Sequence, residues 1–75
     1  MPAHNWWQIE AALKKHGWKE VPTYEERMLY FQNGERTIGY EKSNNMTIPY
    51  TKTVLKRVGI DYESFVVSYS EGGSD

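Results

Sequence analysis

An α+β domain in the order helix, strand, strand, strand, helix is predicted by three features of this sequence. Residues 5–16 and 51–59 each repeat apolar residues every three or four positions, as amphipathic helices do. Between them, Asn33-Gly34 separates two runs in which apolar and polar residues alternate, the pattern of a β-hairpin. We therefore expect a three-stranded antiparallel sheet with helices packed on one face.

Length and composition favour one small domain that is held by packing alone. A chain of 75 residues buries only about 60 to 65 per cent of its unfolded surface, and without cysteine it has no disulfide to add. Its start lacks the basic and apolar blocks of a signal peptide, and no apolar run nears the roughly 18 residues of a membrane span. We expect a cytoplasmic protein without a membrane partner, as a monomer or a homodimer.

The first helix is predicted to begin after Asn5 and to end near His16. Asn5 is a good cap, a glutamine follows three residues later, and Gly17 suits the left-handed residue after the helix. Trp6 shares the apolar face, whereas Trp7 is turned about 100° away from it. We expect Trp6 to be buried under the sheet and Trp7 to be the more exposed indole.

The strands are predicted at residues 18–21, 27–31 and 36–41, with Pro22 ending the first of them. A turn at Asn33-Gly34 would place Leu29 opposite Ile38. One face of the hairpin then carries Leu29, Phe31, Ile38 and Tyr40 toward the helices, and the other carries Met28, Tyr30, Thr37 and Gly39.

After a polar loop at residues 42–45, residues 46–48 are predicted to extend the sheet until Pro49 stops it. Thr51 or Thr53 would cap the second helix, which turns Val54, Leu55 and Val58 inward. Residues 62–69 suit a short helix capped by Asp61, although a strand is also open there. The domain is expected to span residues 1–69, followed by a flexible acidic tail at 70–75.

The sequence offers no convincing catalytic, metal or cofactor site. Of the groups that titrate near neutral pH, His4 is expected in an unordered start and His16 at a helix end. Glu25 and Glu26 are adjacent, so on an extended segment they point to opposite sides. We predict no catalytic residue, no metal ligand set and no cofactor.

Charge is unevenly distributed along a chain whose net charge is −1. Residues 42–60 contain Lys42, Lys52, Lys56 and Arg57 and no acid, whereas the end of the chain is acidic. A solvated helix face with a solubilising tail explains this pattern, and so does a phosphate-binding surface.

The order and spacing of several motifs resemble the HicA family of small toxins. They are Leu-Lys-Lys-His-Gly-Trp at residues 13–18, Ile-Pro at 48–49, and Thr-Val-Leu-Lys-Arg-Val-Gly-Ile at 53–60 with Phe65 after them. HicA proteins are messenger-RNA endoribonucleases of toxin-antitoxin pairs, with a fold similar to the double-stranded-RNA-binding domain. The resemblance covers residues 9–65 and implies this fold and an affinity for RNA.

The chain departs from the HicA pattern at the catalytic position. The family has a histidine there, and this chain has Arg27 after two glutamates. Arginine stays protonated and cannot act as a base, although its planar guanidinium group can bind phosphate. The resemblance therefore implies RNA binding without histidine-driven cleavage, and an active nuclease with a displaced site is the least favoured interpretation.

Two functions remain open. The first is RNA binding, with contacts from Arg27, Tyr30, Lys42, Lys52, Lys56 and Arg57. The second is a protein-interaction module or inhibitor that binds an antitoxin or a host target through Trp7, Met28 and Tyr30.

Overall fold

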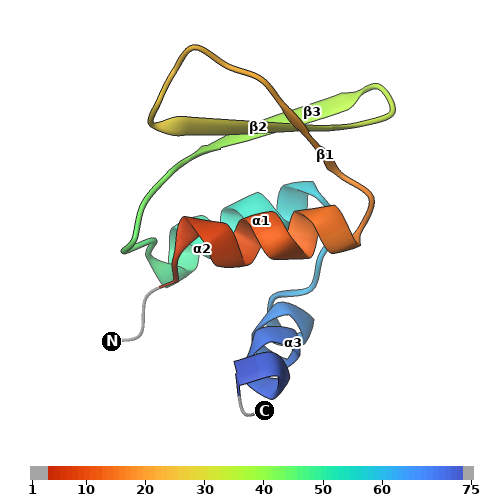
Figure 1. The fold of residues 1–75 in the computed structure, drawn as a ribbon. Helices are drawn as coiled ribbons and strands as arrows, with labels where there is room; N and C mark the ends of the chain where they lie inside the picture. Colours follow the sequence, from red (N-terminus) through yellow and green to blue (C-terminus); the bar gives the residue numbers. More distant parts are fainter. Residues whose placement is uncertain (1–3, 74–75) are drawn as a thin grey trace.

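A computed structural model describes residues 4–73, with the backbone alone for residues 69–73. The elements are α1 (Trp6–Lys15), β1 (Lys19–Val21), β2 (Met28–Asn33), β3 (Arg36–Glu41), α2 (Ile48–Arg57) and α3 (Tyr62–Gly73). The sheet is antiparallel with the strand order β1-β2-β3. Helices α1 and α2 lie side by side under one face of it, and α3 lies beyond them (Figure 1). The predicted α+β class is confirmed.

Helices α1 and α2 end in the same local structure. A glycine with positive φ follows each helix, at 89° for Gly17 and 74° for Gly59. The next N–H then bonds to a carbonyl five residues back, and both of the side chains involved are buried, as in a Schellman motif. These pairs are Trp18 with Leu13 at 2.9 Å and Ile60 with Leu55 at 3.0 Å.

The hairpin turn lies one residue later than the sequence predicts. Asn33 pairs with Arg36, so Gly34 and Glu35 form the turn. Gly34 has a φ of 63°, and no described non-glycine residue has a positive φ. A type II′ turn needs a positive φ only at its first central residue, so glycine alone suffices. The predicted type I′ turn would have needed it at Asn33 as well.

The two faces of the hairpin are nevertheless those predicted. Leu29 pairs with Tyr40 and Phe31 with Ile38, which moves each partner by two residues from the expected register. Because side chains alternate with a period of two, this shift keeps every residue on its expected face. The core consists of Ile9, Leu13, Trp18, Leu29, Phe31, Ile38, Tyr40, Met46, Val54, Leu55, Val58, Ile60 and Phe65.

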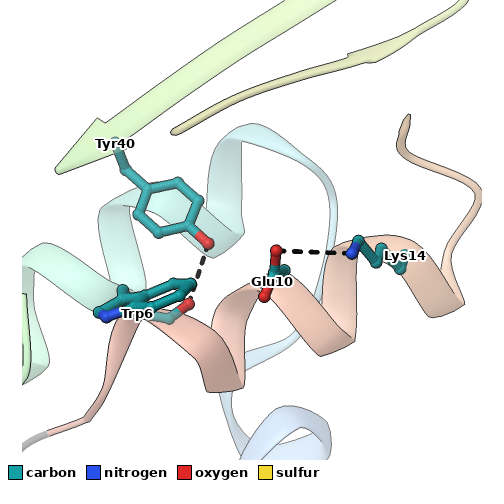
Figure 2. A network of polar contacts seen from close by, with 4 residues as sticks. All are labelled: Trp6, Glu10, Lys14 and Tyr40. Carbon is teal, nitrogen blue, oxygen red and sulfur yellow. Dashed lines mark hydrogen bonds and ion pairs between the residues drawn. The ribbon is translucent and has the colours of Figure 1, made fainter. Parts of the chain in front are cut away.

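Tyr40 ties the sheet to the start of α1. Its ring is fully buried and its hydroxyl donates to the Trp6 carbonyl at 3.0 Å (Figure 2). Burial raises the pKa of Tyr40, so the hydroxyl keeps the proton that it donates. On the same helix, the exposed Lys14 and the half-buried Glu10 form an ion pair at 3.5 Å.

The segment between β3 and α2 differs from the prediction. Residues 46–48 do not extend the sheet, because Met46 pairs instead with His4 and helix α2 already begins at Ile48. The Thr47 side chain caps the helix by accepting from the Tyr50 N–H, and Pro49 lies in the first turn, where its missing N–H costs nothing. Thr51 and Thr53, the predicted caps, lie inside the helix and bond to its own carbonyls.

Hydrogen bonds connect both ends of helix α2 to strand β3. The Glu41 N–H donates to the Tyr50 hydroxyl at 3.2 Å, and the Arg36 guanidinium donates to the Arg57 carbonyl. Since β3 begins at Arg36 and ends at Glu41, the helix runs antiparallel to that strand. As predicted, its buried side includes Val54 and Leu55.

Both ends of the described chain are more ordered than expected. His4 is only 2% exposed, and its backbone exchanges hydrogen bonds with Met46 at 3.0 and 2.8 Å. Residues 62–69 are helical, and Asp61 caps them by accepting from the Ser64 N–H at 3.1 Å. The helix continues to Gly73, so residues 70–73, expected in the flexible tail, are helical. Residues 74 and 75 lie outside the described range.

The two neighbouring indoles differ in the predicted direction. Trp7 is 51% exposed, whereas Trp6 is partly buried and packs against the core. Trp6 is less deeply buried than expected, and the Lys42 ammonium lies 5.3 Å from its ring centroid. Trp6 therefore closes the edge of the core and does not fill its centre.

Replacing Tyr40 by phenylalanine should lower the free energy of unfolding by about 1 to 3 kcal/mol, because the Trp6 carbonyl loses a donor at a partly buried site. Chemical denaturation monitored by circular dichroism measures this change. Tyr50→Phe is the matched control, because that hydroxyl is exposed and water can replace it. Equal losses in the two variants would contradict the role given to Tyr40.

Candidate nucleic-acid interface

The residues predicted to bind nucleic acid do not form one site. Arg27 and Lys42 lie together at the end of the sheet opposite the hairpin turn, where the Lys42 N–H donates to the Arg27 carbonyl at 2.6 Å. Lys52 faces α3, with its ammonium 5.2 Å from the Tyr62 ring centroid. Lys56 and Arg57 occupy the last turn of α2. The structure thus separates Arg27 from the cations of α2.

The cations of α2 instead join others at the hairpin end of the molecule. The last turns of α1 and α2, the start of β1 and the β2–β3 turn all lie at this end (Figure 1). Six of the nine lysines and arginines belong to these segments. We call them the hairpin-end cluster: Lys14, Lys15, Lys19, Arg36, Lys56 and Arg57.

Acidic groups lower the net positive charge of this cluster but do not cancel it. Glu20 and Glu35 lie in the same segments, Asp61 follows α2 in the sequence, and the Glu10 carboxylate pairs with Lys14 at 3.5 Å. The Asp61 carboxylate accepts from the N–H and the hydroxyl of Ser64 at 3.1 and 3.3 Å, so it is turned toward α3. Helix α2 itself contains no acid. The hairpin end is therefore the most basic part of the described chain.

Part of this charge serves the fold. The carbonyl ends of two helices meet here, and cations stabilise such ends. Arg36 does so directly through the Arg57 carbonyl, and its guanidinium carbon lies 5.7 Å from the centroid of the buried Trp18 ring. Lys19, Lys56 and the Arg57 side chain are exposed. These three remain available for a ligand.

Tyr30, predicted to contact either RNA or a protein, has a clear structural role on the open face of the sheet. A Cβ placed on Gly39 would lie 2.6 Å from two atoms of the Tyr30 ring, so the ring occupies the space where a side chain would stand. The Tyr30 hydroxyl donates to the Glu25 carboxylate at 3.0 Å, which raises the pKa of Tyr30. A carboxylate beside the ring also disfavours a phosphate there.

The three predicted protein-binding residues lie on two different sides of the molecule. Met28 and Tyr30 are half-buried on the open face of the sheet. Trp7 lies on the side of α1 away from Ile9, which packs under the sheet. One flat partner surface cannot reach both places, so Trp7 stands apart from the other two.

The histidines form no catalytic arrangement. His4 is buried, and its Nε2 lies 2.7 Å from the Tyr62 hydroxyl. His16 is the exposed C-cap residue of α1, and its Nδ1 lies 2.9 Å from the Ala12 carbonyl. No group of three or more potential metal ligands occurs among the side chains that the structure describes, those of residues 4–68.

Comparison with protein-family models, with curated proteins and with solved structures finds no match for this chain. Within the described range, no helix is long and apolar enough to cross a membrane.

Sequence reasoning missed four members of the hairpin-end cluster because they come from three separate segments. Lys14 and Lys15 end α1, Lys19 begins β1 and Arg36 begins β3. A signal was present, since each of these residues adjoins a predicted turn or helix end. Only the packing of those ends against one another shows that they belong together.

Replacing Gly39 by alanine should destabilise the protein by about 1 to 3 kcal/mol, because the new methyl group displaces the Tyr30 ring. The change should cost little or stabilise in a Tyr30→Ala background, where alanine fits a strand better than glycine. A double-mutant cycle by chemical denaturation measures this coupling. Additive effects of the two substitutions would show that the ring and Gly39 do not constrain each other.

Proposed function

We propose that this chain is a HicA-like RNA-binding domain of the cytosol that does not cleave RNA. The observation that carries the proposal is the hairpin-end cluster, where six of nine cations meet at one end of an α-β-β-β-α domain. Phosphates supply most of the affinity of a protein for RNA, and lysine and arginine are their usual partners. The resemblance to HicA also supports the proposal.

Binding at this end would read the RNA backbone and not its bases. Trp18, which precedes Lys19 in the sequence, is 4% exposed and lies under Arg36. It therefore offers no free ring on which a base could stack. We infer contacts to phosphates by Lys19, Lys56 and Arg57, with Lys52 extending them along α2. Such contacts position RNA with little dependence on its sequence.

Salt dependence tests the proposal. For the wild-type chain, the logarithm of the affinity for a labelled RNA duplex should fall linearly with the logarithm of the salt concentration. Reversing two charges, in Lys56→Glu with Arg57→Glu, should lower that slope by roughly 1.4 to 1.8, since each phosphate contact contributes about 0.7 to 0.9. Fluorescence anisotropy at several salt concentrations measures both quantities.

The structure provides a matched control for charge reversal. Arg27→Glu with Lys42→Glu changes the net charge equally but acts at the opposite end of the sheet. This variant should keep the wild-type slope. Equal losses from the two double variants would show that net charge alone governs binding, and no binding even at about 50 mM salt would reject the RNA proposal.

Cleavage is not expected. Arg27 stands where the resemblance places a catalytic histidine, and the two histidines of the chain lie at opposite ends of α1. Messenger RNA incubated with purified protein should stay intact, and expression should not arrest growth. RNA cleavage that survives both His4→Ala and His16→Ala would show that another group of the chain acts as the acid or base.

A second candidate function, protein binding, is favoured by one observation. Trp7 is 51% exposed on the outer side of α1, and tryptophan is enriched at the centres of protein interfaces. An antitoxin or a host target bound there would leave the hairpin end free. If RNA binding is absent, a stoichiometric partner that is lost on Trp7→Ala and kept on Tyr30→Ala would support this function.

A further inference from the structure

The side of α1 that faces away from the core carries an indole, a methyl group and an ammonium group in a row. Trp7, Ala11 and Lys15 follow one another at intervals of four residues, so they share one side of the helix. All three are exposed, whereas Ile9 and Leu13 of the same helix are buried in the core. We call Trp7, Ala11 and Lys15 the outer stripe of α1.

Lys15 lies beside a recess in the surface. A groove of about 660 Å³ between α1 and α3 and a hollow of about 470 Å³ along α3 are both lined by Lys15 and Ser64. Val67, which is 53% exposed, also lines the hollow. Within the described residues, Lys15 forms no ion pair, in contrast to Lys14. One end of the outer stripe is therefore an unpaired cation next to a recess with an apolar edge.

A second copy of α1, packed antiparallel, would complement the outer stripe. If a twofold axis passes through Ala11, the residue four positions before it in one copy meets the residue four positions after it in the other. Trp7 of each copy then lies beside Lys15 of the other, and a lysine ammonium is attracted by the face of an indole ring. The small alanine at the axis lets the two helices approach closely.

This self-complementarity favours a second copy as the occupant. An isologous interface needs one surface to supply both halves of each contact, and the outer stripe supplies the ring, the cation and the recess beside the cation. The arrangement sets no like charges against each other, because each Lys15 faces an indole and Lys14 is paired with Glu10 at 3.5 Å.

We propose that this chain forms a weak symmetric homodimer through the outer stripe of α1, with Trp7 of each copy packed against Lys15 and the recess of the other. The dimer is weak because the ten residues of α1 span only about 15 Å, too short a helix to bury the roughly 800 Å² per partner of a standard interface. The cations inferred to contact RNA, Lys19, Lys56 and Arg57, lie on other elements and stay accessible in the dimer.

Sedimentation equilibrium of the full chain between about 10 μM and 1 mM covers the range expected of such a small interface. The wild-type chain should pass from monomer to dimer within it. Trp7→Ala removes the ring and Ala11→Lys places two ammonium groups at the axis, so each should weaken association by about tenfold or more. Both sites are exposed, and the circular dichroism of the variants should match that of the wild type.

Tyr24→Ala is the matched control for the loss of an exposed ring. Tyr24 is fully exposed in the segment between β1 and β2, away from the outer stripe, and its loss should leave association unchanged. A wild-type chain that is still monomeric at about 1 mM would overturn the homodimer, and so would equal losses in Trp7→Ala and Tyr24→Ala. A monomer that instead binds another protein through Trp7 would assign the stripe to that partner and reject the homodimer.

The antiparallel arrangement has a test of its own, because the chain contains no cysteine. In Ala11→Cys the two thiols meet at the axis, within reach of a disulfide, so oxidised glutathione should link the copies about tenfold faster than in Tyr24→Cys. Equal rates in the two variants would overturn the twofold axis at Ala11. Neither experiment contains RNA, so its result is independent of the RNA proposal.

Discussion

The inner face of the β2–β3 hairpin is the packing surface on which helices α1 and α2 depend. Phe31 and Tyr40 are fully buried there, with nearly parallel rings whose centroids are 6.1 Å apart. Helix α1 packs against this face through Ile9 and Leu13, and α2 does so with its own apolar side. In 75 residues without a disulfide, no second apolar layer could replace this one. A charge on this face would leave both helices without a partner.

The fold was predictable from the sequence wherever a local pattern decides the structure. The alternation along the hairpin fixed which residues face the helices even though the predicted turn was one residue early, because face assignment depends only on odd or even spacing. Gly17 and Gly59 marked both helix ends correctly for a similar reason. Each helix stop is set by a few consecutive residues and needs no distant contact.

The errors lie where distant segments meet. Nothing near His4 in the sequence indicates its pairing with Met46 or its contact with Tyr62, which is 58 residues away. The strand predicted at residues 46–48 was wrong for the same reason, since its one backbone pairing is with the N-terminal segment. The candidate site was predictable only in part. The cations of α2 were visible in the sequence, whereas Lys19 and Arg36 join them only once the sheet has folded over the helices.

The gathering of cations at one end alters what the net charge of −1 means for an approaching ligand. At physiological ionic strength the field of an exposed charge decays over about 8 Å. The molecule extends 33 Å along its longest axis and 23 Å across, so either dimension spans several such lengths. A polyanion at the hairpin end is therefore screened from most of the acidic groups elsewhere. The polyanion is attracted by the local excess of cations at this end. The net charge of the whole chain is therefore a poor guide to whether a polyanion is attracted or repelled.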